Sequence, residues 1–249
     1  MNDGDCVFPD LPEHYDRALR EAVAYVLERF EPIGILATGT IVRGNPGPTS
    51  DHDIQVLVPG NERLRIQKYF AGVPAEIFVN PPKQIPVYFE NDRKANRPIT
   101  AHMFATAFVV LDRDPEVERL RTLAREYLER GPEYSESELT WLRYAAALYL
   151  EDATDVAESD PEAAAFLASH AVMEMLRFAF FALKGVPVPR WKEILSSVDK
   201  LDPRAGQLAR AFYREPEIAE RLRLATGLAD HVISAHGFFE WESDPEDVE

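Results

Sequence analysis

Two aspartates at the head of an apolar segment constrain this chain more than any other feature. Asp51 and Asp53 lead into residues 54–58, a run with the length and character of a buried strand. Side chains alternate between the faces of a strand, so these aspartates point one way and His52 and Ile54 the other. Two carboxylates this close repel each other unless a cation lies between them, and their hard oxygen atoms suit Mg²⁺. The pair therefore predicts a divalent-metal site, with a solvent-facing strand end as the alternative interpretation.

The loop before the aspartates is rich in Gly and Pro, and it resembles neither of two common phosphate motifs. Gly39 and Gly44 match the first half of a P-loop, but Asn45 and Pro46 stand where that motif requires Lys and Ser or Thr. A dinucleotide fingerprint is excluded because Gly-x-Gly-x-x-Gly is absent and the loop leads into a strand rather than a helix. The loop is therefore interpreted together with the aspartates that follow it.

A glycine and a hydroxyl residue, then a spacer, then Asp-x-Asp resembles the signature of the nucleotidyltransferase superfamily, whose palm domain is shared with DNA polymerase β. The residues that carry this resemblance are Gly39, Thr40, Ser50, Asp51 and Asp53. Thr40 stands where the family usually has Ser, and it keeps the hydroxyl. The family adds a third carboxylate on a later strand, which Glu76 in residues 75–79 matches. A looser similarity over residues 180–192 is to the helical domain of aminoglycoside and lincosamide nucleotidyltransferases.

This resemblance implies a fold and a reaction. The implied fold is an α/β palm with a mixed sheet, followed by an all-α helical bundle, with the active site between the two. The implied reaction is Mg²⁺-dependent transfer of a nucleoside monophosphate, AMP from ATP or its counterpart from another nucleoside triphosphate, to a hydroxyl of a small molecule. Two Mg²⁺ ions would be held by the catalytic carboxylates Asp51, Asp53 and Glu76. The nucleotide would be bound by Gly39, Thr40, Arg43, Ser50 and Lys192.

The charge balance narrows the choice of partners. The 249 residues include 27 Lys and Arg against 43 Asp and Glu, which gives a net charge of −16. Long nucleic acids are poor candidates, because binding a phosphate backbone needs a basic stripe that the sequence lacks. An acidic protein attracts cations, so the expected acceptor is cationic, such as an aminoglycoside, which would give the protein a role in antibiotic resistance.

The sequence also carries expectations about location. Its longest apolar runs fall short of the roughly 20 residues that a membrane-spanning helix needs, so no membrane partner is expected. Residues 1–10 contain three Asp and no Lys or Arg, unlike a secretory signal, so the expected location is cytoplasmic. Cys6 is the single cysteine and can form no internal disulfide. The oligomeric state is left open between monomer and homodimer.

Apolar periodicity predicts two domains and a tail. Strands are predicted over residues 33–38, 54–58 and 75–79, and residues 103–111 fit either a helix or a strand. Helices are predicted over residues 12–30, 115–130, 136–158, 161–183 and 216–239. Ser135 and Glu138 have the spacing of a capping box. The predicted domains are a nucleotidyltransferase domain at 1–112 and a helical bundle at 113–240, followed by a disordered acidic tail at 241–249.

Two questions stay open at this level. The general base is unassigned, with Glu90, Asp92 and Glu174 as candidates, and His170, Glu174 and Arg177 are interpreted as a buried polar network on one helix face. Two other functions also fit the pattern. One is a regulatory nucleotidyltransferase that acts on or binds a protein partner, as antitoxins of this superfamily do, and the other is a nucleotide-binding module without catalysis.

Overall fold

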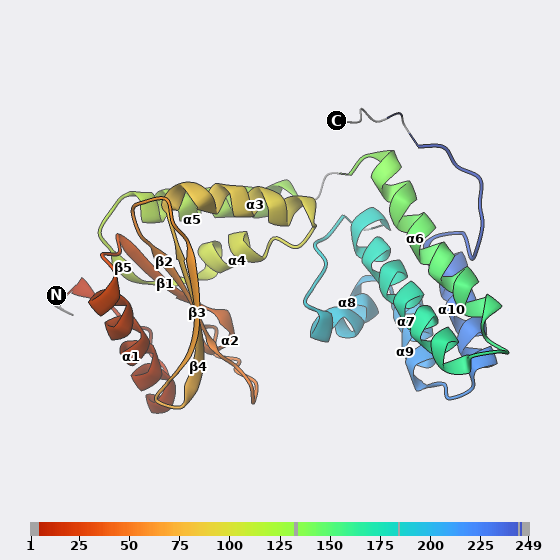
Figure 1. Ribbon diagram of the computed structural model, residues 1–249, viewed down its shortest axis with the longest axis horizontal. Helices are drawn as coiled ribbons and strands as arrows, with labels where there is room; N and C mark the ends of the chain where they lie inside the picture. Colours follow the sequence, from red (N-terminus) through yellow and green to blue (C-terminus); the bar gives the residue numbers. More distant parts are fainter. Residues whose placement is uncertain (1–4, 132–133, 184, 244, 246–249) are drawn as a thin grey trace. The chain divides into compact units, whose positions relative to one another are not determined.

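The computed structural model describes residues 5–131, 134–183, 185–243 and 245, and it divides the chain into two compact units, residues 1–130 and 131–249 (Figure 1). The boundary after Arg130 differs from the expected one after residue 112. The reason is that helix α5 (Glu116–Arg130) buries Val117, Leu120 and Ala124 in the same apolar cluster as two other helices of the first unit. The segment expected to open the helical bundle therefore completes the α/β unit.

The first unit is built on a mixed five-stranded sheet. Its strands are β1 (Gly34–Thr38), β2 (His52–Leu57), β3 (Leu64–Phe70), β4 (Val73–Asn80) and β5 (Phe108–Asp112), in the order β3-β4-β2-β1-β5. β2 and β4 run parallel, and the other neighbouring pairs are antiparallel. β1 is buried along its whole length, as expected for a strand with neighbours on both sides and helices on both faces. This confirms the prediction of an α/β unit with a mixed sheet.

Each face of the sheet has its own core. On one face, α1 (Glu13–Arg29) packs Leu19 and Val23 against Ile54 and Ile77. On the other face, Leu36 and Leu57 pack against α5 and two shorter helices. Those two helices are α3 (Ile85–Lys94), preceded by the short helix η2 (Pro82–Gln84), and α4 (Ile99–Thr106). Because side chains alternate along β2, Asp53 shares the second face with Leu57.

Three local features of this unit differ from the sequence-based expectation. The loop predicted from residue 39 begins with a four-residue helix, α2 (Gly39–Val42). Residues 103–111, which fitted a helix or a strand, contain both, because α4 ends at Thr106 and β5 begins at Phe108. β3 was not predicted, since it is an exposed edge strand whose side chains are mostly polar.

Among the described residues of the second unit, all regular secondary structure is helical. The helices are α6 (Glu136–Asp155), α7 (Pro161–Phe178), η3 (Ala179–Leu183), η4 (Trp191–Glu193), α8 (Ile194–Leu201), α9 (Pro203–Arg214) and α10 (Ile218–Val232). One cluster of buried residues from these helices forms its core. The predicted capping box is confirmed, since the Ser135 hydroxyl accepts from the Glu138 backbone N–H at 3.1 Å and Glu138 Oε2 accepts from the Ser135 N–H at 2.8 Å.

Two sequence predictions concern the most apolar helix of this unit and the tail that follows its last helix. Residues 161–183 form one apolar helical segment, long enough to cross a membrane and with an 18-residue window of mean hydropathy 1.4. Half of that window is buried inside the protein, which is typical of a core helix and makes the segment weak evidence for a membrane span. The predicted tail at 241–249 lies mostly outside the described residues. Within it, Trp241 packs against Trp141, with ring centroids 4.7 Å apart.

Candidate metal and nucleotide site

Three carboxylates meet on one face of the first unit's sheet. Asp51 directly precedes β2, Asp53 lies on β2, and Glu76 lies opposite Asp53 on the parallel strand β4. One carboxylate oxygen from each residue lies within 4.8 Å of the other two, and all three side chains are half-buried. The sequence prediction that these residues come together is confirmed. Strand pairing produces the cluster, because residues directly opposite each other on neighbouring strands project from the same face.

His52 lies between the two aspartates and faces the other side of the sheet, as predicted. Its side chain is buried, and its Nε2 lies 3.0 Å from the backbone carbonyl oxygen of Tyr15. Burial lowers the pKa of the His52 imidazole, which favours the neutral ring with Nε2–H as the donor to that carbonyl. His52 therefore anchors β2 to the segment at the start of α1 and leaves the opposite face to the carboxylates.

At Gly39, the glycine of the predicted signature, both the backbone conformation and the surrounding space exclude a side chain. Gly39 has φ of +90°, and a Cβ at this position would lie 2.5 Å from Oδ2 of Asp53. A side chain here would push the aspartate out of the cluster or strain the backbone. Gly39 therefore permits the chain to turn from β1 into α2 directly beside Asp53.

The two hydroxyl residues of the signature also lie together. The Thr40 and Ser50 hydroxyl oxygens are 2.8 Å apart, and Ser50 Oγ accepts a hydrogen bond from the Gly47 backbone N–H at 2.8 Å. These contacts close the loop between α2 and β2. They place both hydroxyls next to the start of β2, where the aspartates lie.

The two cations predicted to bind nucleotide are found in different units. Arg43 is exposed and follows the last turn of α2. Lys192 is exposed in η4 of the second unit. The structure leaves both assignments as predictions.

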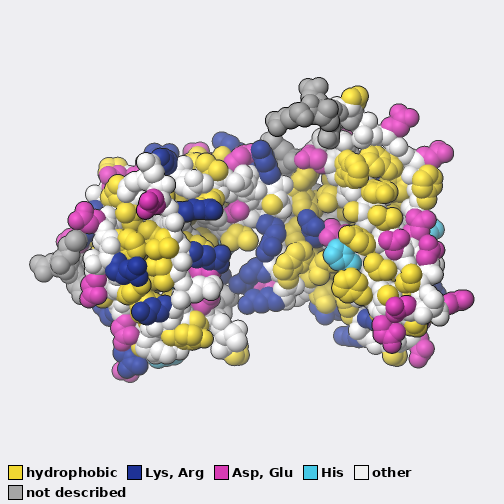
Figure 2. Space-filling view, viewed as in Figure 1, with side chains coloured by type: hydrophobic (Ala, Val, Ile, Leu, Met, Phe, Trp, Pro, Cys, Tyr) yellow, Lys and Arg dark blue, Asp and Glu magenta, His cyan; other side chains and the backbone are white. Residues whose placement is uncertain are grey.

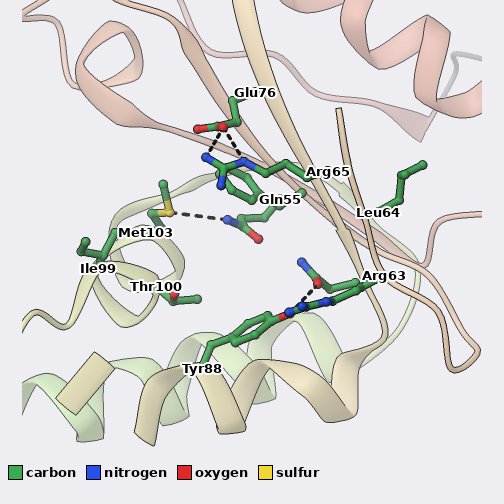
Figure 3. Close-up of a pocket in the computed structure, with 11 residues that line it drawn as sticks. Gln55, Arg63, Leu64, Arg65, Glu76, Tyr88, Ile99, Thr100 and Met103 are labelled. Carbon is green, nitrogen blue, oxygen red and sulfur yellow. Dashed lines mark hydrogen bonds and ion pairs between the residues drawn. The ribbon is translucent and has the colours of Figure 1, made fainter. Parts of the chain in front are cut away.

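Glu76 has two partners that the sequence analysis missed. Its Oε1 accepts from Nε of Arg65 at 2.5 Å (Figure 3) and from Nε2 of Gln67 at 2.7 Å. Both partners lie on the edge strand β3, where Gln67 is directly opposite Glu76. Strand alternation could have revealed these partners, because Arg65 and Gln67 lie two residues apart and therefore share one strand face. That inference would have required predicting β3 first. Arg65 and Gln67 hold this carboxylate in a fixed orientation.

A cavity of about 550 Å³ continues from Glu76 along the same face of the sheet. Its floor is made by Gln55 of β2 and by Phe78 and Asn80 of β4, and Met103 and Thr100 of α4 contribute to its lining. Figure 3 shows Glu76 and Arg65 at one end and Arg63 with Tyr88 at the other. A cavity of this size accommodates a small molecule.

The candidates for a general base have other contacts. Both oxygens of Glu90 accept from Arg93, at 3.0 and 3.3 Å, and Asp92 accepts from the Thr100 backbone N–H at 2.7 Å. Glu174 accepts from Arg177 at 2.8 and 2.9 Å. The interpretation of a buried network around Glu174 is wrong at His170, which is exposed.

The donor set at the cluster fits a divalent metal. Three carboxylates within 4.8 Å of one another repel, and a divalent cation bound among them would offset more of this repulsion than the ion pair of Glu76 with Arg65 does alone. Carboxylate oxygens are the hard ligands that Mg²⁺ prefers, and a partly open site leaves positions for water and for substrate phosphates.

Comparison with known proteins bears on the fold. No protein-family model and no curated protein matches the chain. Among solved structures, the chain is similar to a nucleotidyltransferase-like protein from Exiguobacterium sibiricum, with a TM-score of 0.53 and 13% sequence identity. The similarity covers 87% of this chain and 73% of that one, so it extends beyond the α/β unit into the helical region. At this identity the likeness concerns the fold, and it supports the α/β nucleotidyltransferase-like architecture.

Proposed function

We propose that this protein is a metal-dependent nucleotidyltransferase that moves a nucleoside monophosphate, with AMP from ATP as the first candidate, to a hydroxyl of a small molecule. The observation that carries the proposal is the meeting of Asp51, Asp53 and Glu76 beside Gly39, on two parallel strands of a mixed sheet. The likeness of the fold to a nucleotidyltransferase-like protein supports it.

In this proposal, different residues of the chain bind the metal ions and the nucleotide. Asp51, Asp53 and Glu76 would hold two Mg²⁺ ions, which when bound neutralise phosphate charge and acidify the attacking hydroxyl. The backbone N–H groups of Gly39 and Thr40, with the paired hydroxyls of Thr40 and Ser50, would bind the β and γ phosphates. Arg43 and Lys192 would add positive charge to nucleotide binding.

The chemical balance of the reaction is simple. The acceptor hydroxyl oxygen attacks the α-phosphorus, a new P–O bond forms, and the bond from that phosphorus to the β-phosphate oxygen breaks. Pyrophosphate leaves with the electron pair, and the hydroxyl proton passes to water. Arg65 and Gln67 contribute by fixing the carboxylate of Glu76, and a ligand held within a few tenths of an ångström is what such a transfer requires.

Two measurements test the proposal. The first is Mn²⁺ binding followed by electron paramagnetic resonance. The second is pyrophosphate release from ATP and Mg²⁺ over a panel of hydroxyl compounds that includes aminoglycosides and lincosamides. Asp53→Asn is expected to weaken Mn²⁺ binding and to slow pyrophosphate release, each by more than about 100-fold. Loss of a residue that only hydrogen-bonds to a metal ligand already costs about 10- to 100-fold in affinity or activity. The matched control is Asp16→Asn, because Asp16 on α1 pairs with Arg20 on the helix that covers the opposite face.

The outcomes separate the alternatives. Metal-dependent ATP binding without release for any small acceptor would shift the function to a protein substrate. ATP binding that is indifferent to Mg²⁺ would favour a nucleotide-binding module without catalysis. Failure of the wild-type protein to bind Mn²⁺ would refute the metal site itself.

A further inference from the structure

The cavity beside Glu76 differs in charge from the chain as a whole. Residues 1–130 contain 16 Lys and Arg against 20 Asp and Glu, whereas residues 131–249 contain 11 against 23. Most of the net negative charge therefore belongs to the second unit. On the face in view, basic side chains gather over the region of β3 and β4 (Figure 2), where Arg63 and Arg65, which line the cavity, are exposed. The acidity that suggested a cationic acceptor is not a property of this surface.

Inside the cavity, positive charge exceeds negative. Its lining contains Arg63 and Arg65 and one carboxylate, Glu76. Glu76 is already neutralised by its ion pair with Arg65. This leaves the guanidinium of Arg63, at the end away from Glu76, as a positive charge that donates a hydrogen bond to the neutral Tyr88 hydroxyl, at 2.9 Å. A cationic ligand would be repelled at that end, and an anionic group would be attracted.

The side chains in the middle of the cavity are those that commonly bind a planar ring. Phe78 lies on its floor with the Arg65 guanidinium 5.0 Å from the ring centroid, and Tyr88 and Met103 supply further polarisable surface. Gln55 and Asn80 are buried amides there. Nε2 of Gln55 lies 3.4 Å from the Met103 sulfur, and Oδ1 of Asn80 accepts from the Tyr88 hydroxyl at 3.2 Å. Aromatic and thioether surface with a few fixed polar groups is typical of sites for planar small molecules.

The length of the cavity follows from β4. Glu76 and Asn80 are four residues apart on one strand, which corresponds to about 13 Å. Arg63 precedes β3 and is next in register to Asn80, because Leu64 pairs with Val79. A molecule with a hydroxyl at Glu76 and an anionic group reaching toward Arg63 would thus have about the length of a substituted single ring.

We infer that this cavity binds the acceptor, and that the acceptor is a planar hydroxyl compound carrying a carboxylate or phosphate rather than a polycation. Its hydroxyl lies at the Glu76 end, its ring lies against Phe78 and Tyr88, and Arg63 binds its anionic group. The inference rests on the proposed function for the identity of the ligand as acceptor, while the binding preference itself can be measured without catalysis.

The test compares probes that share a ring and a hydroxyl and differ in charge. The probes are 4-hydroxyphenylacetate, 4-hydroxybenzylphosphonate, neutral 4-(2-hydroxyethyl)phenol and cationic tyramine, titrated into the full-length protein by ligand-observed NMR. We expect one of the anions to bind at least about tenfold more tightly than tyramine, as one charge-assisted contact allows. The stronger anion identifies the carboxylate or the phosphate form. Pyrophosphate release is then measured with the same four compounds.

Matched variants locate the effect. Arg63→Gln should remove the preference for the anion, a loss of about tenfold in its affinity. Arg29→Gln is the control, because Arg29 is also exposed and also donates to a tyrosine hydroxyl, that of Tyr25, but on the helix that covers the opposite face. Arg29→Gln should leave binding unchanged.

The inference and the proposed function can fail separately. Equal binding of all four probes, binding of none, a preference for tyramine, or an anion preference that persists in Arg63→Gln would overturn the inference. Release of pyrophosphate with an aminoglycoside but with no anionic probe would also overturn it, while the proposed function would stand. Anion binding that needs Arg63, with no pyrophosphate release from any nucleotide, would keep the cavity's preference and refute transfer to a small molecule.

Discussion

At the scale of single residues, two half-buried carboxylates each accept hydrogen bonds from several donors. Glu76 is held by Arg65 and Gln67, and Asp202 is held in a comparable way at the start of α9. One oxygen of Asp202 accepts from the backbone N–H groups of Arg204 and Ala205 at 3.1 Å, and both oxygens lie 3.1 Å from Nε2 of His231. Asp202 thus caps one helix and contacts the next.

These contacts predict how the stability of the second unit depends on pH. Burial alone would raise the pKa of Asp202, but the hydrogen bonds from Ala205 and His231 outweigh it and lower the pKa below its ordinary value. The ionised form is therefore favoured in the folded state. Its contribution is fully present above the unfolded pKa of about 3.9, and it is lost as pH falls through the lower folded value.

Asp202→Asn tests this dependence, since Asn also caps helices well but carries no charge. We expect the variant to be less stable than the wild type by about 1 kcal/mol at pH 7, the difference between charged and neutral hydrogen bonds. The difference should shrink as pH falls below 4. Urea unfolding of both proteins between pH 3 and 7, followed by tryptophan fluorescence, measures it, and a difference that stays constant over this range would contradict the assignment.

The residues of the candidate metal site could be identified from the sequence, whereas the residues that hydrogen-bond to Glu76 could not. Asp51 and Asp53 are two residues apart at the head of a predicted strand, so alternation alone predicts that they share a face, whereas Gly39 was placed beside them through the resemblance to a family. Glu76 was found through the resemblance to a family. Arg65 and Gln67 were missed because an exposed, mostly polar strand has little apolar alternation to mark it, although the two-residue turn Ala71-Gly72, with positive φ at both positions, is typical of a hairpin.

At the scale of elements, close helix packing in the second unit depends on one glycine. Gly206 is buried in α9, and a Cβ there would lie 2.9 Å from Cα and 3.1 Å from N of Asp199 in α8. These are backbone atoms, which cannot turn away as the end of a side chain can. The same approach brings Asp199 within 2.6 Å of the Arg210 guanidinium. Neither α8 nor α9 was predicted, although the buried residues of both helices recur at helical spacing and belong to the core of the second unit. Examples are Ile194 and Val198 in α8 and Leu208 and Phe212 in α9.

Gly206→Ala should therefore destabilise the second unit. Overpacking costs about 1–3 kcal/mol, which exceeds the gain of about 1 kcal/mol that alanine gives in a helix. Gly227→Ala in α10 is the matched control, because its Cβ would meet only a side-chain atom of Leu208 at an ordinary 3.7 Å. We expect the control to be as stable as the wild type or up to about 1 kcal/mol more stable. Urea unfolding followed by tryptophan fluorescence compares the two, and a stabilised Gly206→Ala would show that α8 moves freely.

At the scale of the whole molecule, the two units differ in core, charge and spectroscopic signal. The first unit has one apolar cluster on each face of its sheet, and the second has a cluster of its own. The carboxylate cluster lies entirely in the first unit. All three tryptophans, Trp141, Trp191 and Trp241, lie in the second. The chain therefore carries an internal reporter for the unit that does not contain the proposed metal site.

This separation makes the effect of Mg²⁺ on thermal unfolding specific. A ligand that binds only the folded state raises the melting temperature of the unit that holds it, by about 5 °C or more when its concentration is 100 times the dissociation constant. We expect calorimetry to show that shift, with the unfolding followed by tryptophan fluorescence unchanged. Asp53→Asn should abolish the calorimetric shift, and NaCl at equal ionic strength controls for screening of the net charge. An equal shift in the tryptophan signal would mean that the units unfold together or that the metal binds among the acidic residues of the second, and the assignment of the site to the first unit would then lose its thermodynamic support.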